Sequence, residues 1–185
     1  MKKNLLVFGS TMVVLGLPVL FQLQLAAFDD DSFGLLLRLT ARLAFLVFLL
    51  VFIARPLRQL SVSTMSKWLL KNRRYVGITF AAVMTVHLIL LVALNGVQLV
   101  IPGIFAFLLI YLMLLTSFDK PAAALGPRRW RWLHKAGIYV IGGVFTLTIV
   151  SSVSEMPGNP IYLAMAALLL VSITIRVSAF VKRDS

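Results

Sequence analysis

Cysteine is absent from this sequence, histidine occurs only twice, and acidic residues number six among 185. The absence of cysteine excludes disulfides, thiolate-bound zinc, iron–sulfur clusters and haem attached through thioether bonds, so any redox cofactor must be held by other side chains. A dinucleotide-binding fingerprint is also absent, because Gly142 and Gly143 lie inside an apolar run rather than between a strand and a helix. We therefore expect no flavin or NAD domain in this chain.

Charge is scarce overall: 13% of the residues are charged, 61% are hydrophobic, and the mean hydropathy is +0.99. A soluble domain is about half apolar and about a quarter charged. In water, the polar residues of this chain could not cover its apolar surface, and the exposed patches would far exceed those of soluble monomers. The composition therefore indicates an integral membrane protein.

Long apolar runs divide the chain into six segments, each close to the roughly 20 residues that a helix needs to cross the hydrocarbon core. They cover roughly 5–25, 35–54, 75–94, 100–118, 135–153 and 161–180. The first run is longer than the core of a typical signal peptide, so we expect an uncleaved helix there. The sequence thus predicts one all-α domain over residues 1–185, a bundle of six transmembrane helices.

Positive charge is distributed very unevenly between the loops. The loops after the second and fourth spans and the two chain ends hold most of the Lys and Arg residues, and the other three loops hold none; those three carry Asp29, Asp30, Asp31 and Glu155. By the positive-inside rule this predicts an N-in/C-in protein of the bacterial inner membrane. A net charge of +12 would suggest nucleic acid in a soluble protein. These clusters lack stacking aromatics, so we expect no nucleic acid and assign them to the lipid bilayer.

Four side chains that carry or accept charge fall within the predicted spans or at their edge: Arg38, Arg42, His87 and His134. Such residues are costly in hydrocarbon and are functional candidates by default. His87 is expected roughly 18 Å above the cytoplasmic boundary and Arg42 roughly 10 Å below the outer face, at similar depths. Arg38 shares a helix face with Arg42. His134 lies at the cytoplasmic edge of the fifth span.

Several roles suit these residues. An imidazole and two guanidinium groups at one depth suit a cofactor that carries carboxylates and a metal, such as haem b, or a proton path. Plainer roles are an interhelical hydrogen bond for His87 and interfacial anchoring for His134. Arg38 would then reach the headgroups and Arg42 would pair with the nearby aspartates. Arg176, near the end of the last span, is expected to reach the cytoplasmic headgroups in the same way.

Strings spread over most of the chain carry a family resemblance. They are Thr40-Ala41-Arg42 leading to Ala54-Arg55-Pro56-Leu57-Arg58, Arg73-Arg74-Tyr75-Val76-Gly77 ahead of His87, Ser117-Phe118-Asp119, and Leu125-Gly126-Pro127-Arg128-Arg129-Trp130-Arg131-Trp132-Leu133-His134. They resemble the ferric-reductase-like transmembrane superfamily, most closely the small bacterial branch with the membrane haem subunit of the periplasmic methionine-sulfoxide reductase system. The resemblance implies haem b held by histidines of the third and fifth spans. By position, His87 matches the outer histidine and His134 the inner one, with Arg42 and Arg38 beside the propionates.

The sequence departs from the family at one ligand. The family usually places another histidine 13 or 14 residues after the first one in the fifth span, where this chain has Leu147 and Thr148. His87 and His134 are expected roughly 18 Å apart along the membrane normal. The two axial ligands of one iron lie about 4 Å apart, so these histidines cannot share a haem. A thioether from Met84 or Met165, a ligand from a partner subunit, or the loss of haem are the remaining alternatives.

Three functions follow from these alternatives. The first is a haem b transmembrane electron-transfer subunit, with the haem in the outer half at His87 and its propionates paired with Arg42 and Arg38. It would serve a separate periplasmic oxidoreductase and take electrons from a cytoplasmic flavin reductase or from quinol. At most, the chain is then the membrane subunit of an enzyme. The second is a haem-free member of the fold that acts as a membrane scaffold or accessory subunit. The third is a small proton or anion transporter, which the buried cations and His87 would serve.

Overall fold

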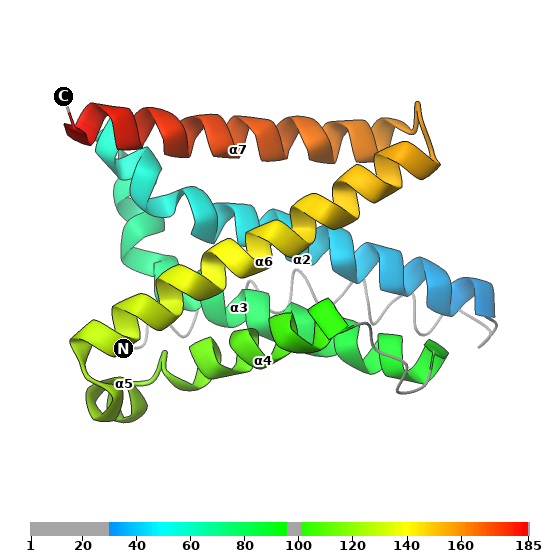
Figure 1. The fold of residues 1–185 in the computed structure, drawn as a ribbon, viewed down its shortest axis with the longest axis horizontal. Helices are drawn as coiled ribbons and strands as arrows, with labels where there is room; N and C mark the ends of the chain where they lie inside the picture. Colours follow the sequence, from blue (N-terminus) through cyan, green and yellow to red (C-terminus); the bar gives the residue numbers. More distant parts are fainter. Residues whose placement is uncertain (1–29, 96–100, 185) are drawn as a thin grey trace.

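The computed structural model describes residues 30–95 and 101–184, and all regular elements in these two ranges are α-helices. They are α2 (Asp30–Leu60), α3 (Thr64–Asn95), α4 (Ile101–Leu115), α5 (Asp119–Leu125), α6 (Pro127–Glu155) and α7 (Pro160–Asp184) (Figure 1). The expected first span, 5–25, lies outside the described residues. Six spans with an N-in/C-in orientation therefore stay a prediction, whereas the all-helical class is confirmed for the described part.

Four of the helices are long and apolar enough to cross a membrane: Gly34–Leu60, Thr64–Ala93, Pro127–Glu155 and Pro160–Lys182. A fifth span exists if α4 and α5 are taken together, but the pair is bent by 106°. The 15 residues of α4 cover roughly 22 Å, less than the roughly 30 Å of the hydrocarbon core. The expected span 100–118 is thus shorter and sharply bent at its end. The described chain has the helices of a multi-pass membrane protein.

Helices α2 and α3 form the central hairpin, connected by residues 61–63. Ser63 and Ser66 cap the start of α3 reciprocally: the Ser66 N–H donates to Ser63 Oγ at 3.1 Å and the Ser63 N–H donates to Ser66 Oγ at 3.0 Å. The Ser66 hydroxyl also donates to the Ser61 carbonyl at 2.6 Å. Because the first N–H groups of a helix have no partner within the helix, these bonds define where α3 begins and keep the hairpin tight.

Phenylalanines fill the middle of the bundle. This aromatic cluster consists of Phe45, Phe48 and Phe52 from α2, Phe80 from α3 and Phe145 from α6, with contacting ring centroids 5.2 to 6.3 Å apart. Helix α6 approaches α2 closely at Gly142, where an added Cβ would lie 3.4 Å from the Phe48 ring. Aromatic pairs of this kind contribute about 0.5–1.5 kcal/mol each beyond their buried area. The aromatic cluster therefore connects α2, α3 and α6.

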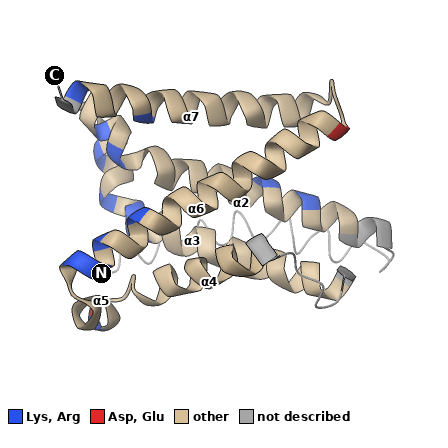
Figure 2. Ribbon diagram, in the orientation of Figure 1, with Lys and Arg blue, Asp and Glu red and all other residues tan. Residues whose placement is uncertain are grey.

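Helices α6 and α7 meet at a turn and diverge away from it (Figure 1). Gly158 in that turn has a φ of +91°, which only glycine adopts without strain. The ends that diverge are the basic ones: Figure 2 shows Lys and Arg gathered where α2 ends, α3 and α6 begin and α7 ends, with Glu155 at the opposite end. The uneven charge expected along the chain is thus present in space, and we call this the basic end.

Candidate functional site

The two histidines lie on opposite sides of the aromatic cluster. Helices α3 and α6 both run away from the basic end, and Phe80 of α3 contacts Phe145 of α6. His87 lies seven residues beyond Phe80, about 10 Å further along α3, and His134 lies eleven residues before Phe145, about 16 Å back along α6. His134 therefore belongs to the basic end and His87 to the other end of the bundle.

His134 is held by Thr116, the residue that follows α4, and by Trp130 of its own helix. Its Nε2 lies 3.1 Å from Thr116 Oγ1, and the Thr116 hydroxyl donates its proton to the Leu112 carbonyl at 2.7 Å. At this contact the neutral imidazole donates in its Nε2–H tautomer and accepts in its Nδ1–H tautomer. Trp130 stacks on His134 with ring centroids 4.3 Å apart and donates its indole N–H to the Thr116 carbonyl at 2.8 Å. Thr116 thus orients both rings.

His87 forms the same kind of contact with a threonine, here Thr40 of α2. Its Nδ1 lies 3.0 Å from Thr40 Oγ1, and the Thr40 hydroxyl donates to the Leu36 carbonyl at 2.9 Å. Thr40 is 1% exposed, so this hydrogen bond joins α2 and α3 away from solvent. At this contact the neutral imidazole donates in its Nδ1–H tautomer and accepts in its Nε2–H tautomer. An interhelical hydrogen bond is one of the roles expected for His87.

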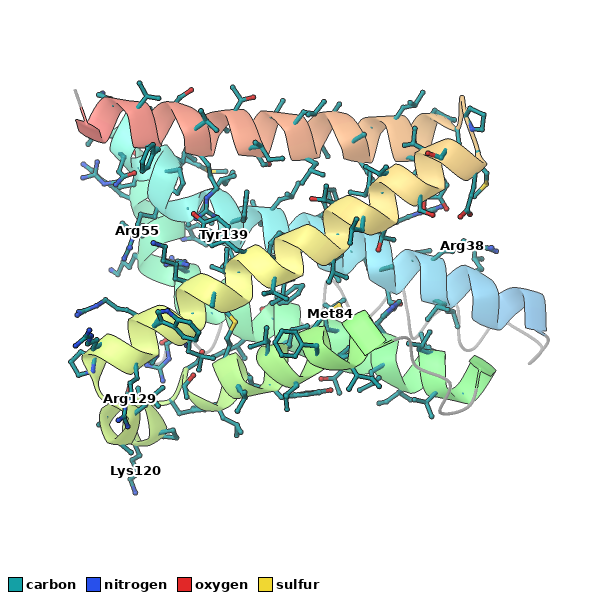
Figure 3. All side chains as sticks on the ribbon, viewed as in Figure 1. Arg38, Arg55, Met84, Lys120, Arg129 and Tyr139 are labelled. Carbon is teal, nitrogen blue, oxygen red and sulfur yellow. The ribbon has the colours of Figure 1, made fainter. Side chains whose placement is uncertain are left out.

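The arginines expected beside His87 lie on a different face of α2. Arg38 and Arg42 are each two residues from Thr40, which is about 200° around the helix. The Arg42 guanidinium lies over the ring of Tyr162 in α7, 5.6 Å from its centroid. Arg38 is exposed (Figure 3). The structure thus brings His87 together with Thr40 and directs the two arginines elsewhere, because sequence depth does not specify a helix face.

At positions 147 and 148, one of which carries a histidine in the family, the side chains of this protein also face outward. Leu147 is 70% exposed, and Thr148 is exposed with its hydroxyl bonded to the Val144 carbonyl of its own helix. The two methionines considered as ligands, Met84 and Met165, pack against the hydrophobic core of the bundle, as does Met113 of α4. A side chain at position 147 or 148 would therefore face away from the bundle interior.

An inner cavity of about 390 Å³ lies between α2, α3, α4 and α6 at the basic end. Its polar lining residues are Arg73, Arg74, Thr116, Ser117, Asp119, Trp130 and His134. Its other walls are apolar, and at Gly77 an added Cβ would meet nothing within 4 Å. Met113 also lines it, and its sulfur packs directly over Gly137, one turn beyond His134. The sequence reasoning missed Met113, whose only signal was its place close to Thr116.

A second space, the α6–α7 groove, measures about 740 Å³ and lies between α2, α6 and α7. Five residues line both spaces and form the partition between them: Val51, Arg73, Trp130, His134 and Ile138. Arg176 extends into the groove, where its guanidinium lies 4.1 Å from the ring centroid of Phe52 and 4.7 Å from that of Tyr139. That Arg176 reaches the headgroups stays a prediction; in the structure it lines the groove, held between these two aromatic rings.

Arg74 and Asp119 close the inner cavity on the side of α5. Their side chains form an ion pair of 2.8 Å and are 42% and 91% exposed. An exposed pair contributes at most about 1 kcal/mol. Its effect is to tie the start of α5, a helix without buried residues, to α3.

Among the described residues, no three His, Cys, Asp or Glu side chains gather as they would around a bare metal ion. A metal at this site would need a prosthetic group to supply most of its ligands. Comparison of the whole chain with family models, curated proteins and solved structures finds no match.

Proposed function

We propose that this protein is a ferric-reductase-like membrane protein that binds haem b in the inner cavity and transfers electrons for a separate oxidoreductase. The observation that carries the proposal is the pair of possible iron ligands on facing helices, His134 of α6 and Met113 of α4, which line one cavity together. Haem supplies one-electron redox chemistry when bound. The family resemblance of the sequence strings supports the same assignment.

The residues of the inner cavity fit this group. Imidazole and thioether are a known axial pair for haem iron. The other ring nitrogen of a metal-bound histidine usually donates to a neighbouring acceptor, which is what Thr116 provides for His134. Arg73 and Arg74 would hold the carboxylates, and the apolar walls would exclude water. The volume of about 390 Å³ lies within the roughly 300–1,000 Å³ of cofactor sites.

The direction of electron transfer follows from the proposed orientation. With six spans, both termini inside and the basic end at the cytoplasmic face of a bacterial inner membrane, His134 lies near the cytoplasm. Electrons would come from a cytoplasmic flavin reductase or from quinol, and a periplasmic oxidoreductase would receive them. The end of the bundle that holds His87 would then face that acceptor.

An optical spectrum of the purified protein tests the proposal. After expression with added haem precursor, we expect a Soret band and a pyridine-haemochrome spectrum of haem b. Met113→Leu should keep the fold and change the visible bands, because it removes one iron ligand. Met84→Leu is the matched control and should leave the spectrum as in the native protein. A protein that shows no Soret band even after haem is added would overturn the proposal.

The haem-free scaffold remains the second candidate, because one observation favours it. Leu147 stands where the family has its outer histidine and is 70% exposed, so the outer site lacks one of its two ligands. A scaffold predicts that a partner protein co-purifies equally well with the native chain and with His134→Ala. If haem is absent and co-purification is unchanged, the scaffold function is favoured over electron transfer.

A further inference from the structure

The α6–α7 groove gathers positive charge from four helices. Its cationic lining residues are Arg55 of α2, Arg73 of α3, Arg131 and Lys135 of α6, and Arg176 of α7. Of the described residues that line it, none is Asp or Glu. Asp119, the acidic residue bound at this end, pairs with Arg74 on the far side of the partition. The groove is therefore a cationic site without a carboxylate among its described lining residues.

These cations are close enough to repel one another. Arg55, Arg73 and Arg176 line this one groove, and the side chain of Arg73 is partly buried. Arg176 is held in place by its position between Phe52 and Tyr139, and its guanidinium reaches the Phe52 carbonyl and the Tyr139 hydroxyl only through long contacts of 3.4 Å. Like charges gathered in a low-dielectric setting are stabilised most by a bound anion.

The rest of the groove suits a hydrocarbon chain. Its wall is formed by apolar side chains of α2, α6 and α7, namely Val51, Ile138, Leu169, Ile173 and Val177. Gly143 adds an open stretch of backbone, since a Cβ there would meet nothing within 4 Å. The groove lies where α6 and α7 diverge, as Figure 1 shows for the two helices. Charge and apolar wall thus combine in one site of about 740 Å³.

We propose that the α6–α7 groove binds one anionic phospholipid, with its phosphate between Arg55 and Arg176 and an acyl chain along the apolar wall. A soluble anion would use the cations but not the wall, and a neutral lipid would use the wall but leave the cations unpaired. Only an anionic phospholipid satisfies both parts. The proposal does not depend on haem in the inner cavity, which lies on the other side of the partition.

Native mass spectrometry of the delipidated full chain tests this proposal, with phosphatidylglycerol and phosphatidylcholine of identical acyl chains added separately. We expect phosphatidylglycerol to bind at least about tenfold more tightly, since each arginine near a phosphate favours it. The double variant Arg55→Gln/Arg176→Gln should bring the two affinities within about twofold of each other. The control Arg128→Gln/Arg129→Gln removes the same charge from exposed positions outside the groove and should keep the preference.

A second variant guards against misfolding, because removing Arg176 also removes its packing on Phe52 and Tyr139. Gly143→Leu adds bulk to the open wall without changing any charge. It should weaken phosphatidylglycerol binding and leave the thermal unfolding of the lipid-free protein unchanged. Equal affinity of the native chain for both lipids would overturn the proposal. So would an equal loss in the control variant, or displacement of phosphatidylglycerol by an equal concentration of glycerol phosphate.

Discussion

The two histidine regions share a local arrangement and differ in everything around it. In each, an imidazole nitrogen lies within hydrogen-bond distance of a threonine hydroxyl from a neighbouring segment, and that hydroxyl donates to a carbonyl four residues earlier in its own segment. His134 borders both spaces described at the basic end, whereas in the described part of the chain His87 lines neither. A hydrogen bond to threonine therefore does not distinguish a ligand from a structural histidine. The cavity and the positive charge next to His134 are what make it a candidate ligand.

The largest expected effect separates the two histidines directly. His134→Ala should abolish haem binding, because it removes the imidazole that lines the inner cavity, and His87→Ala should retain the haem of the native protein. Haem content per protein, measured by the pyridine-haemochrome assay, checks both variants. Loss of haem in His87→Ala with retention in His134→Ala would reverse the assignment of the two regions.

The two threonines should also have different effects. Thr116→Val removes the acceptor that orients His134 and should weaken haem affinity by about 10–100-fold. Thr40→Val removes the partner of His87 and should cost about 1 kcal/mol of stability while haem affinity stays unchanged. Haem titration and thermal unfolding of both variants provide the measurements. Identical changes in the two variants would show that the regions are equivalent.

Gly142 and Gly143 lie on a packed face and an open face of α6, so substitutions at the two positions should have different effects on stability. Gly142→Leu should destabilise the bundle by about 1–3 kcal/mol, since its Cβ would already lie 3.4 Å from the Phe48 ring. Gly143→Leu faces open space and should be tolerated. Thermal unfolding of the two variants measures the difference. Equal destabilisation would mean that α6 does not approach α2 as described.

The smallest effect is expected at the edge of the inner cavity. Asp119→Asn breaks the exposed ion pair with Arg74, and the free energy of unfolding should fall by at most about 1 kcal/mol. The haem spectrum should not change, because Asp119 has no role as an iron ligand in the proposal. Unfolding at low and high salt gives the check: the difference from the native protein should shrink as salt increases.

Sequence patterns anticipated the described helices better than their ends. The span expected at 75–94 lies within α3, which begins eleven residues earlier at Thr64. Hydropathy identifies only the segment of a helix that prefers hydrocarbon. The hydrogen bonding of α3 continues through the basic residues that precede this segment. The span expected at 100–118 ends at Leu115 instead, where the chain bends into α5. Apolar composition alone contains no signal for such a bend.

The candidate site was anticipated only in part, and the reason is again physical. His134 was identified because a titratable group at the edge of a span is unusual. Met113 was missed because methionine in an apolar helix is ordinarily a packing residue. Its sulfur occupies the space that the missing side chain of Gly137 leaves on α6, one turn beyond His134. The sequence pattern of a single segment cannot predict how side chains of two helices pack together.

By itself, the sequence determined that this is a helical membrane protein, which segments are apolar enough to span, and that its cations gather in a few clusters. These properties are additive along the chain, because transfer into lipid and helix formation depend on nearby residues. Only the tertiary structure decided which residues meet: Thr40 rather than Arg42 at His87, Met113 near His134, and Arg176 inside the groove. Helix rotation and crossing are set by side-chain packing between segments far apart in the chain, and that information is not local.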